Sequence, residues 1–371
     1  MHDSSKTILT IIGARPQWMK AAALSRILRS EPSQIQERFV HTGQHISDEM
    51  SGQFFKELQL PEVDFQLQVG SDPATRMGQM MAGIGEAIER VRPDAVLLYG
   101  DTDSTLAGAW AASRAHIPVI HIEAGLRSFD REMPEEINRI LTDQIADLLF
   151  CPSQAAAAQL KNEGIFTGAR TGLEVHVCGD LMLDTARYFG GAPRPSQGAI
   201  TNILLTMHRP SNVDDKERLV AWFESIGTLA KERNLHVIFP VHPRTEKMLL
   251  KTWGEGWSQR LSKWGIQCEK PAGYLQMLQW LKEVDAVWTD SGGLQKEAFF
   301  MHRPALVLRS TSEWVELLDG GFAALCPEPS DLPNQFDSLE RNTCLNFEVD
   351  LYGTGQAASD IVRKLNSWLK K

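Results

Sequence analysis

The chain has 371 residues, of which 43% are hydrophobic and 23% are charged; this composition is typical of a folded globular protein and excludes wholesale disorder. At roughly 150 residues per domain, the length predicts two domains. The 38 Lys and Arg residues against 47 Asp and Glu residues give a formal net charge of −9, which disfavours a broad nucleic-acid-binding face.

Membrane and metal-binding signals are weak. No apolar stretch approaches the roughly 18 to 20 residues that a spanning helix needs, and the polar start of the chain is unlike a signal peptide. The cysteines form an odd, scattered set, which argues against a disulfide framework or a zinc site. We therefore expect a cytoplasmic protein with no membrane insertion, no metal and free thiols at Cys151, Cys178, Cys268, Cys326 and Cys344.

Short apolar runs alternate with helical patterns through the first half of the chain. Residues 7–13 predict a buried strand, and Pro16 fits the first turn of a helix that follows it. Continuous apolar strands separated by helices are typical of a parallel sheet covered on both faces. Further strands are expected at residues 38–43, 94–101, 118–123 and 148–153.

The alternation weakens between residues 164 and 200 and then restarts. Glycines and prolines cluster near the end of this stretch, which predicts a linker: Gly190, Gly191, Pro193, Pro195 and Gly198. One helix after the linker has apolar residues on a single face, namely Leu219, Phe223, Ile226 and Ala230. Strands are expected at residues 203–209, 236–242, 286–290 and 304–309.

This pattern predicts an α/β protein of two doubly wound, Rossmann-like domains that face one another across a cleft. We place the N-terminal domain at residues 1–185 and the C-terminal domain at residues 200–350. Residues 351–371 are expected to form a C-terminal helix that packs back on the N-terminal domain.

Charged or titratable side chains follow nearly every expected strand, where parallel sheets bind their ligands. Ordinary surface polarity explains any one of these strand ends equally well. Seven together favour a binding site. They are the segments after the expected strands that carry Arg15, Gln44 with His45, Asp101, Glu123, His208 with Arg209, His242, and Asp290.

The segment Asp290-Ser291-Gly292-Gly293 precedes an expected helix at residues 294–301. Glycines let the backbone approach an anion, and a helix N-terminus offers unpaired N–H groups. Taken alone, the segment fits an ordinary turn with Asp290 or Ser291 as the N-cap. The chain lacks both a phosphate loop of the Gly-x-x-x-x-Gly-Lys-Ser/Thr type and a Gly-x-Gly-x-x-Gly turn, so ATP hydrolysis and dinucleotide binding lose support.

Acidic residues are the candidates for proton transfer. Asp101 and Glu123 close successive strands, where crowding of carboxylates raises a pKa and readies an acid or base. Glu135 and Glu136 follow Pro134 in the first turn of a helix, where acids complement the dipole. We prefer that explanation for Glu136, with Arg139 as its helical ion-pair partner. For Glu135, both a catalytic role and the dipole explanation stay open.

Basic residues at the strand ends suit a phosphate group. His208 and His242 are candidates for phosphate contact or proton donation, although a histidine at a strand end is more often structural. Arg15 suits oxyanion binding, whereas Lys20 fits a solvated surface position equally well.

Seven short motifs, in this order, closely resemble those of the non-hydrolysing UDP-N-acetylglucosamine 2-epimerases. The resemblance runs from about residue 7 to about residue 327, and only the ordered set is specific. The motifs are Gly-Ala-Arg-Pro (13–16), Thr-Gly-Gln-His (42–45), Gly-Asp-Thr (100–102), Glu-Ala-Gly-Leu-Arg (123–127), Pro-Glu-Glu-Ile-Asn-Arg (134–139), His-Arg (208–209) and Thr-Asp-Ser-Gly-Gly-Leu-Gln-Lys-Glu (289–297).

The resemblance implies a GT-B-like fold with a UDP-sugar held between the domains, a homodimer, and a role in polysaccharide biosynthesis. It implies C2 inversion by elimination of UDP to a 2-acetamidoglucal and re-addition, without a redox cofactor. The implied catalytic residues are Asp101, Glu123, Glu135 and His208, the last assisting UDP departure. The implied substrate contacts are Arg15, Lys20, Gln44, His242, Ser291, Gly292, Gly293 and Glu297, with Glu297 on the ribose.

Several positions depart from the family pattern. Gln17 replaces a carboxylate, and Pro-Ser-Asn follows His208-Arg209 where many members carry Glu before the Asn. Ile-Ser-Asp at residues 46–48 replaces a run common in members with a regulatory second UDP-sugar site, which argues against allosteric activation. Residues 311–316 resemble the branch that acts on UDP-2,3-diacetamido-2,3-dideoxyglucuronate.

Three other functions fit the same fold. A hydrolysing epimerase would release UDP and free N-acetylmannosamine. A glycosyltransferase has less need of three acids, because it does not deprotonate C2. A UDP-sugar sensor is disfavoured by the joint presence of those acids and His208.

Overall fold

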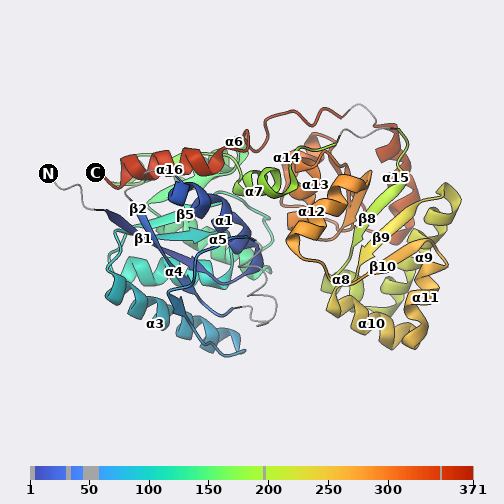
Figure 1. Ribbon diagram of the computed structural model, residues 1–371, viewed down its shortest axis with the longest axis horizontal. Helices are drawn as coiled ribbons and strands as arrows, with labels where there is room; N and C mark the ends of the chain where they lie inside the picture. The colour runs from blue at the N-terminus through green and yellow to red at the C-terminus, as the bar shows by residue number, and fades with distance from the viewer. Residues whose placement is uncertain (1–4, 31–34, 45–57, 195–197, 343–344, 371) are drawn as a thin grey trace. The chain divides into compact units, whose positions relative to one another are not determined.

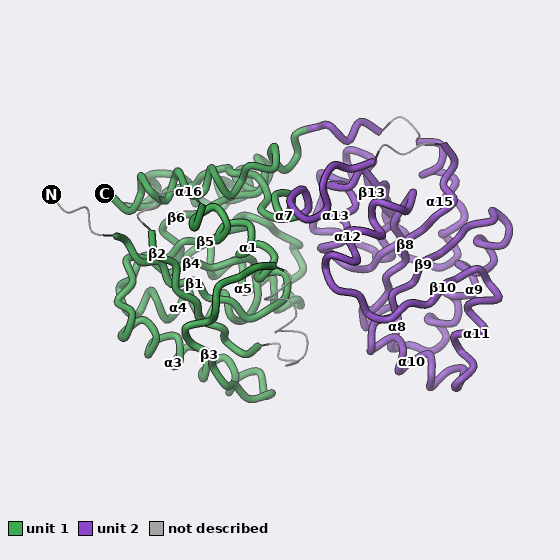
Figure 2. The backbone as a smooth tube through the Cα atoms, viewed as in Figure 1, with its two compact units in different colours: residues 1–185, 350–371 green, residues 186–349 purple. Residues whose placement is uncertain are grey.

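The computed structural model describes residues 5–30, 35–44, 58–194, 198–342 and 345–370. The chain divides into two compact units. Unit 1 comprises Met1–Thr185 and Asp350–Lys371, and unit 2 comprises Ala186–Val349 (Figure 2). Each unit is an α/β body built on its own parallel sheet (Figure 1), as the alternation of strands and helices predicts.

Among the described residues, unit 1 has a seven-stranded sheet in the order β3-β2-β1-β4-β5-β6-β7, and all neighbouring strands pair in parallel. The central strands are almost wholly buried, because helices cover both faces. The strands are β1 (Lys6–Ile12), β2 (Ile35–His41), β3 (Phe65–Gln66), β4 (Ala95–Tyr99), β5 (Val119–Ile122), β6 (Leu148–Cys151) and β7 (Glu174–Val177).

The helices of unit 1 include one from the C-terminal end of the chain. Helix α16 packs against α1. At the start of α16, the backbone N–H groups of Ala357 and Ala358 donate hydrogen bonds to the carboxylate of Asp184. The helices are α1 (Arg15–Ser30), α3 (Pro73–Val91), α4 (Asp103–Arg114), α5 (Pro134–Ile145), α6 (Gln154–Asn162), α7 (Leu181–Gly190), which continues into unit 2, and α16 (Ala357–Trp368).

Unit 2 contains a six-stranded parallel sheet in the order β10-β9-β8-β11-β12-β13 within its described part. The large side chains of Trp222, Phe223 and Trp288 are fully buried in its core. The strands are β8 (Asn202–Thr206), β9 (His236–Pro240), β10 (Ile266–Glu269), β11 (Ala286–Thr289), β12 (Ala305–Val307) and β13 (Ala323–Leu325).

Four helices of unit 2, namely α8, α9, α10 and α15, start at a side-chain cap or a proline. Asp215 caps α9 by accepting from the N–H of Arg218 at 2.8 Å, and the four predicted apolar positions of α9 are all buried. The helices are α8 (Pro210–Val213), α9 (Lys216–Arg233), α10 (Pro243–Trp253), α11 (Trp257–Ser262), α12 (Tyr274–Glu283), α13 (Gly292–Phe300), α14 (Val315–Asp319) and α15 (Leu332–Arg341).

The strands expected from apolar runs are confirmed, but the expected linker is partly wrong. Residues 164–200 contain the whole of β7 and α7, and Pro195 lies outside the described residues. Strand β7 escaped the sequence analysis because all four of its residues are only partly buried, so it forms no continuous apolar run. The short strands β3, β10 and β13 were missed for a similar reason.

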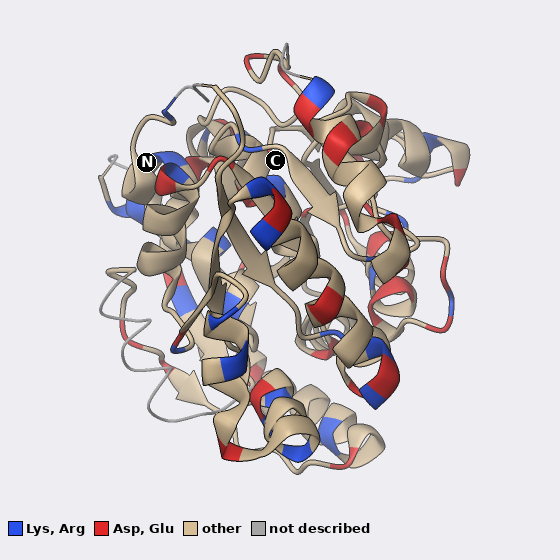
Figure 3. Cartoon of the chain, turned by 90° about the vertical axis from the view of Figure 1, so that its right-hand side faces the viewer, with Lys and Arg blue, Asp and Glu red and all other residues tan. Residues whose placement is uncertain are grey.

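No helix in the described part of the chain combines the length and the hydropathy that a membrane span requires. The four cysteines in that part are free thiols, and burial raises the pKa of Cys326 to about 12; Cys344 lies outside it. Acidic and basic residues are interspersed along the helices that face the viewer in Figure 3.

Glu37 of β2 is a partly buried ionisable group of unit 1. Its carboxyl oxygens accept hydrogen bonds from Thr10 at 2.8 Å and Ser25 at 2.5 Å. Burial raises the pKa of Glu37 from 4.5 to about 7, against the opposing effect of these hydrogen bonds. The native state therefore holds this proton more tightly than the unfolded chain does.

Glu37→Gln is expected to remove a pH-dependent loss of stability. Because the pKa of Glu37 is raised in the folded protein, its protonated carboxyl stabilises the native state below pH 4.5. This contribution to the free energy of unfolding is lost as the pH rises through about 7. Between pH 5 and pH 8 the wild type should lose roughly 3 kcal/mol more unfolding free energy than the variant. Urea unfolding at both pH values measures this, with exposed Glu62→Gln as the matched control. Equal pH dependence in wild type and Glu37→Gln would contradict the prediction.

Candidate active site

Asp101 follows β4 at the carboxyl edge of the unit 1 sheet and forms an ion pair with Arg139 of α5. Arg139 is buried, and its second terminal nitrogen lies 3.0 Å from the Glu136 carboxylate. Asn138 donates to the backbone carbonyl of Asp101 at 3.0 Å. The predicted Arg139–Glu136 pair is thus confirmed, and the same guanidinium also holds the Asp101 carboxylate in place.

Glu123 follows β5, the strand next to β4, and forms an ion pair with Lys20 of α1. Lys20 is only 6% exposed, so the interpretation of Lys20 as a solvated surface residue is wrong. A Cβ placed on Gly100 would lie 3.3 Å from the Glu123 carboxylate and 3.5 Å from Lys20 Nζ. Glu123 itself has a left-handed φ of 73°, a conformation uncommon for residues other than glycine. The expected crowding of carboxylates is therefore replaced by two separate ion pairs.

Glu135 and Glu136 have different surroundings. Glu136 is 1% exposed and accepts hydrogen bonds from the N–H and hydroxyl of Ser128 and from the N–H of Phe129, at 2.8 to 3.0 Å. It organises the loop before α5, so its role exceeds the expected interaction with the helix dipole. Glu135 is exposed and has no hydrogen bond or ion pair with the described residues.

Gln17 has a structural role that the sequence analysis missed. Its side-chain oxygen accepts from the N–H groups of Gly13 and Ala14 at 2.7 and 3.0 Å, and its amide nitrogen donates to the carbonyl of Tyr99 at 2.8 Å. It thereby ties the turn that carries Arg15, the partly exposed first residue of α1, to the end of β4. A carboxylate could not donate to the Tyr99 carbonyl, so the glutamine suits these partners.

Gln17→Met is expected to lower the free energy of unfolding by roughly 2 to 4 kcal/mol, since it leaves buried backbone groups without partners. Urea denaturation checks this. Gln17→Glu keeps an acceptor for the N–H groups of Gly13 and Ala14, so its free energy of unfolding should fall by less than that of Gln17→Met. A Met variant as stable as wild type would contradict this role.

Gln44 lies at the carboxyl end of β2 and accepts from the N–H and the hydroxyl of Ser104 at 3.0 and 2.6 Å. Its oxygen therefore caps the start of α4, a function the motif did not indicate. His45 and residues 46–48 lie outside the described residues.

A buried network behind Asp101 was also missed. His121 of β5 places Nδ1 2.7 Å from Asp143 and Nε2 2.8 Å from the carbonyl of Gly100. Both ring nitrogens lie within hydrogen-bond distance of an oxygen, so the ring is held in one orientation. Arg127 lies 2.7 Å from the other Asp143 oxygen and also contacts Glu163. This network fixes the backbone immediately before Asp101.

Asp290 organises the turn after β8 in unit 2. Its fully buried carboxylate accepts from the N–H groups of His208 and Arg209 at 2.9 and 2.8 Å and lies 3.1 Å from His208 Nδ1. Burial acts to raise the pKa of Asp290, but the hydrogen bonds and the His208 charge outweigh it and hold the pKa below its usual value. Asp290 is therefore not the N-cap of α13. It orients the His208 ring with Nε2 directed away from Asp290.

His242 lies beside His208, with ring centroids 5.2 Å apart. Its Nδ1 accepts from the N–H of Arg244 at 3.1 Å and caps α10. Burial, followed by the neighbouring His208 charge, lowers the pKa of His242, which favours a neutral ring at neutral pH. Its contacts thus fit a helix cap more directly than a proton donor.

The expected anion-binding turn lies at the carboxyl end of β11. Ser291 occupies the N-cap position of α13 and its N–H donates to Thr289 Oγ1 at 2.9 Å. Gly292 and Gly293 open the helix, and a Cβ on Gly293 would meet no atom within 4 Å. The backbone at Gly293 is therefore accessible to a ligand. Glu297, one turn further along α13, is 7% exposed.

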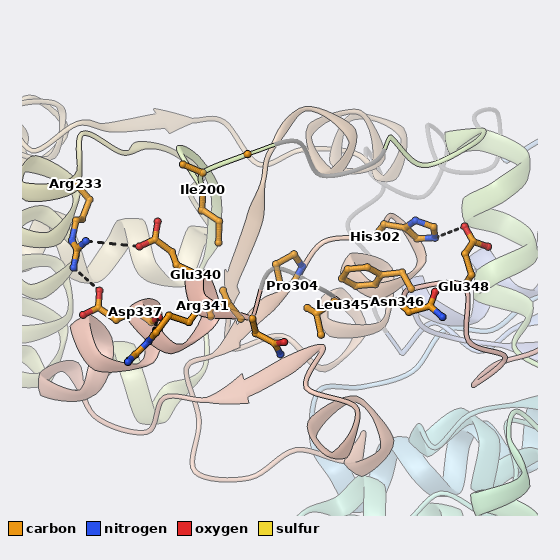
Figure 4. A pocket seen from close by; sticks show the side chains of 15 residues that line it. Ile200, Arg233, His302, Pro304, Asp337, Glu340, Arg341, Leu345, Asn346 and Glu348 are labelled. Atoms are coloured by element: carbon orange, nitrogen blue, oxygen red, sulfur yellow. Dashed lines mark hydrogen bonds and ion pairs between the residues drawn. The ribbon is translucent and has the colours of Figure 1, made fainter.

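A separate pocket of unit 2 has a volume of about 940 Å³ and is lined in part by Ile200 and Pro304, which precede β8 and β12 (Figure 4). It therefore lies at the amino ends of these strands, away from Ser291. Within its lining, Arg233 forms ion pairs with Asp337 at 2.5 Å and with Glu340 at 3.9 Å. This pocket does not contain the predicted site residues.

Comparisons with known proteins agree with the motif order. A family model described as UDP-N-acetylglucosamine 2-epimerase matches residues 27–366. The chain is 42% identical to a Pseudomonas aeruginosa UDP-2,3-diacetamido-2,3-dideoxy-D-glucuronate 2-epimerase, over 96% of this chain and 99% of the relative. It is 35% identical to a Methanocaldococcus jannaschii UDP-N-acetylglucosamine 2-epimerase, over 96% of this chain and 97% of that relative. The crystal structure of the M. jannaschii enzyme with UDP-GlcNAc and UDP gives a TM-score of 0.82 at 34% identity, covering 98% of this chain and 99% of that one.

Proposed function

The chain belongs to the UDP-N-acetylglucosamine 2-epimerase family, and we propose that residues of both units invert C2 of a UDP-linked 2-acetamido sugar. The family match confirms the resemblance read from the motifs and identifies a nucleotide-sugar 2-epimerase. The proposal concerns which residues act, and on which sugar.

The reaction is an elimination followed by an addition. A base removes the C2 proton, the C–H electron pair forms the C1–C2 double bond, and the C1–O electron pair leaves with UDP. The 2-acetamidoglucal is then protonated at C2 from the opposite face, and UDP oxygen attacks C1. No electron is gained or lost overall, so the chemistry consists of proton transfer and charge stabilisation.

The acids of unit 1 act on the sugar in this proposal. The observation that carries it is the pair of carboxylates at adjacent strand ends, Asp101 with Arg139 and Glu123 with Lys20. Each carboxylate lies against a cation that fixes its position, which suits proton abstraction at C2 and stabilisation of positive charge at C1. Glu135 is the third acid, and its exposure leaves it accessible to a ligand.

The residues of unit 2 bind and release UDP. His208 receives support from Asp290 at Nδ1, which leaves Nε2 to protonate the departing diphosphate. Ser291, Gly292 and Gly293 bind phosphate through the helix N-terminus. Arg15 of unit 1 is a further candidate for oxyanion binding. Glu297 contacts the ribose, and His242, which lies beside His208, is a further substrate contact in unit 2. Lys20 and Gln44 are candidate substrate contacts in unit 1.

A second candidate substrate is UDP-2,3-diacetamido-2,3-dideoxyglucuronate. Two observations favour it: the 42% identity to the P. aeruginosa relative of that name, and the segment at residues 311–316, which departs from the pattern of the UDP-N-acetylglucosamine enzymes.

Chromatography of both UDP-sugars after incubation with the enzyme tests the function. We expect the C2 epimer of at least one substrate to form without stoichiometric free UDP. Stoichiometric UDP with free sugar would establish the hydrolysing alternative, and no conversion of either substrate would overturn the proposal.

The resemblance also implies a homodimer that acts in the cytoplasm and supplies N-acetylmannosamine-type sugars to a surface polysaccharide. Sedimentation of the purified chain tests the dimer, which should have twice the 41.5 kDa mass of one chain.

A further inference from the structure

The first residue of helix α13 is already in contact with a carboxylate of the chain itself. A Cβ placed on Gly292 would lie 2.0 Å from Glu313 Oε1 and 3.2 Å from Glu313 Cδ. Only glycine leaves room for this carboxylate. The Glu313 side chain is 15% exposed, so it is largely enclosed by its neighbours.

Arg309 holds this carboxylate from the next strand end. Its Nη1 lies 3.0 Å from Glu313 Oε2, and its side chain is 12% exposed. Arg309 follows β12, which pairs with β11, the strand that leads to Ser291. The guanidinium therefore comes from the strand adjacent to the anion-binding turn, at the same carboxyl edge of the sheet.

The segment between Arg309 and Trp314 is fastened to α13. Trp314 Nε1 donates to the carbonyl of Gly292 at 2.9 Å, and Ser312 Oγ donates to Gln295 at 2.6 Å. The ammonium of Lys296 lies 3.9 Å from the centroid of the Trp314 ring. Glu313 is thus set against Gly292 by its neighbours on both sides.

We propose that Glu313 occupies part of the diphosphate position when no nucleotide is bound, and that Arg309 is a phosphate-binding residue held in reserve by Glu313. A diphosphate approaching Gly292 repels the carboxylate and offers Arg309 a more highly charged partner of suitable geometry. Binding therefore exchanges the Arg309–Glu313 ion pair for one between Arg309 and a phosphate oxygen. This inference rests on the proposed function, which assigns the turn at Ser291–Gly293 to the diphosphate.

Binding of UDP and of uridine to single variants tests the exchange. Glu313→Gln keeps the shape of the side chain and removes the competing charge, so UDP should bind roughly three- to tenfold more tightly. Arg309→Gln should weaken UDP binding roughly tenfold or more. Uridine, which lacks phosphate, should bind all variants as it binds wild type. Glu255→Gln makes the same charge change at an exposed position and should leave UDP binding unchanged.

The inference is overturned if Glu313→Gln binds UDP no better than wild type, if Arg309→Gln keeps wild-type affinity, or if uridine binding shifts with UDP binding. Glu313→Ala gives a second neutral variant, and thermal unfolding shows whether each variant is folded. A wild-type enzyme that neither binds UDP nor epimerises a UDP-sugar would instead overturn the proposed function. If the enzyme is active but its UDP affinity is unchanged in Glu313→Gln, only the proposed exchange of ion pairs at Arg309 is overturned.

Discussion

Asp101→Asn is expected to lower hydrogen exchange at C2 of the sugar by roughly a thousandfold or more, while UDP binding stays within about tenfold of wild type, or ~1.4 kcal/mol. The amide has nearly the shape of the carboxylate and still accepts a hydrogen bond from Arg139, but it carries no charge and is a poor base. The chemical step should therefore fail while the nucleotide site proposed in unit 2 remains intact.

Mass spectrometry of the substrate in heavy water measures exchange at C2, and calorimetry measures UDP binding. Asp72→Asn is the matched control, because Asp72 is an exposed N-cap of α3 and asparagine caps helices equally well. Full exchange in Asp101→Asn would remove Asp101 from the mechanism. Loss of UDP binding together with exchange would show that Asp101 acts mainly through structure.

His208→Gln is expected to slow epimerisation by roughly 10² to 10⁴-fold, the range typical of a lost general acid. Glutamine retains a donor that can reach Asp290, so the turn after β8 should keep its conformation. UDP affinity should change much less than the rate, because the phosphate contacts proposed at Ser291 and Gly293 are not altered.

His236→Gln, at an exposed position on β9, serves as the control and should retain wild-type rates. Rates come from chromatographic separation of the two epimers. A His208→Gln enzyme of nearly wild-type rate would show that UDP leaves without protonation by this histidine.

The sheets could be predicted from the sequence because their central strands are continuous apolar runs. Strand β4 (Ala95–Tyr99) is buried at every residue, so its pattern is unambiguous. The edge strands β3 and β13 have only two and three residues, too few for periodicity to identify. The interior strands thus confirm the predicted fold class. The strands that the sequence did not predict lie at the edges of the two sheets.

The strand-end positions of the candidate site could also be predicted, but their partners could not. Asp101 pairs with a residue 38 positions away and Glu123 with one 103 positions away, and no spacing rule links side chains so distant in sequence. Gln17 was noted as a departure from the family pattern. Its side chain bonds both to the turn after β1 and to the end of β4. These partners come together only because β1 and β4 pair in the sheet, which the sequence does not state.

Asp290 illustrates an error of local reasoning. An acid before two glycines and a helix resembles an N-cap, yet its carboxylate faces residues 81 and 82 positions earlier in the chain. The tertiary partners His208 and Arg209 outweigh the local preference. Lys20 is a similar case, since a buried ion pair with Glu123 replaces the surface exposure that its helix position permitted.

The fate of hydrogen at C2 tests the central claim most directly. Wild-type enzyme incubated with its UDP-sugar in heavy water should yield product epimer that carries one deuterium at C2, with UDP still attached. An epimer that retains its original hydrogen at C2 would contradict proton removal by these carboxylates and, with it, the elimination mechanism.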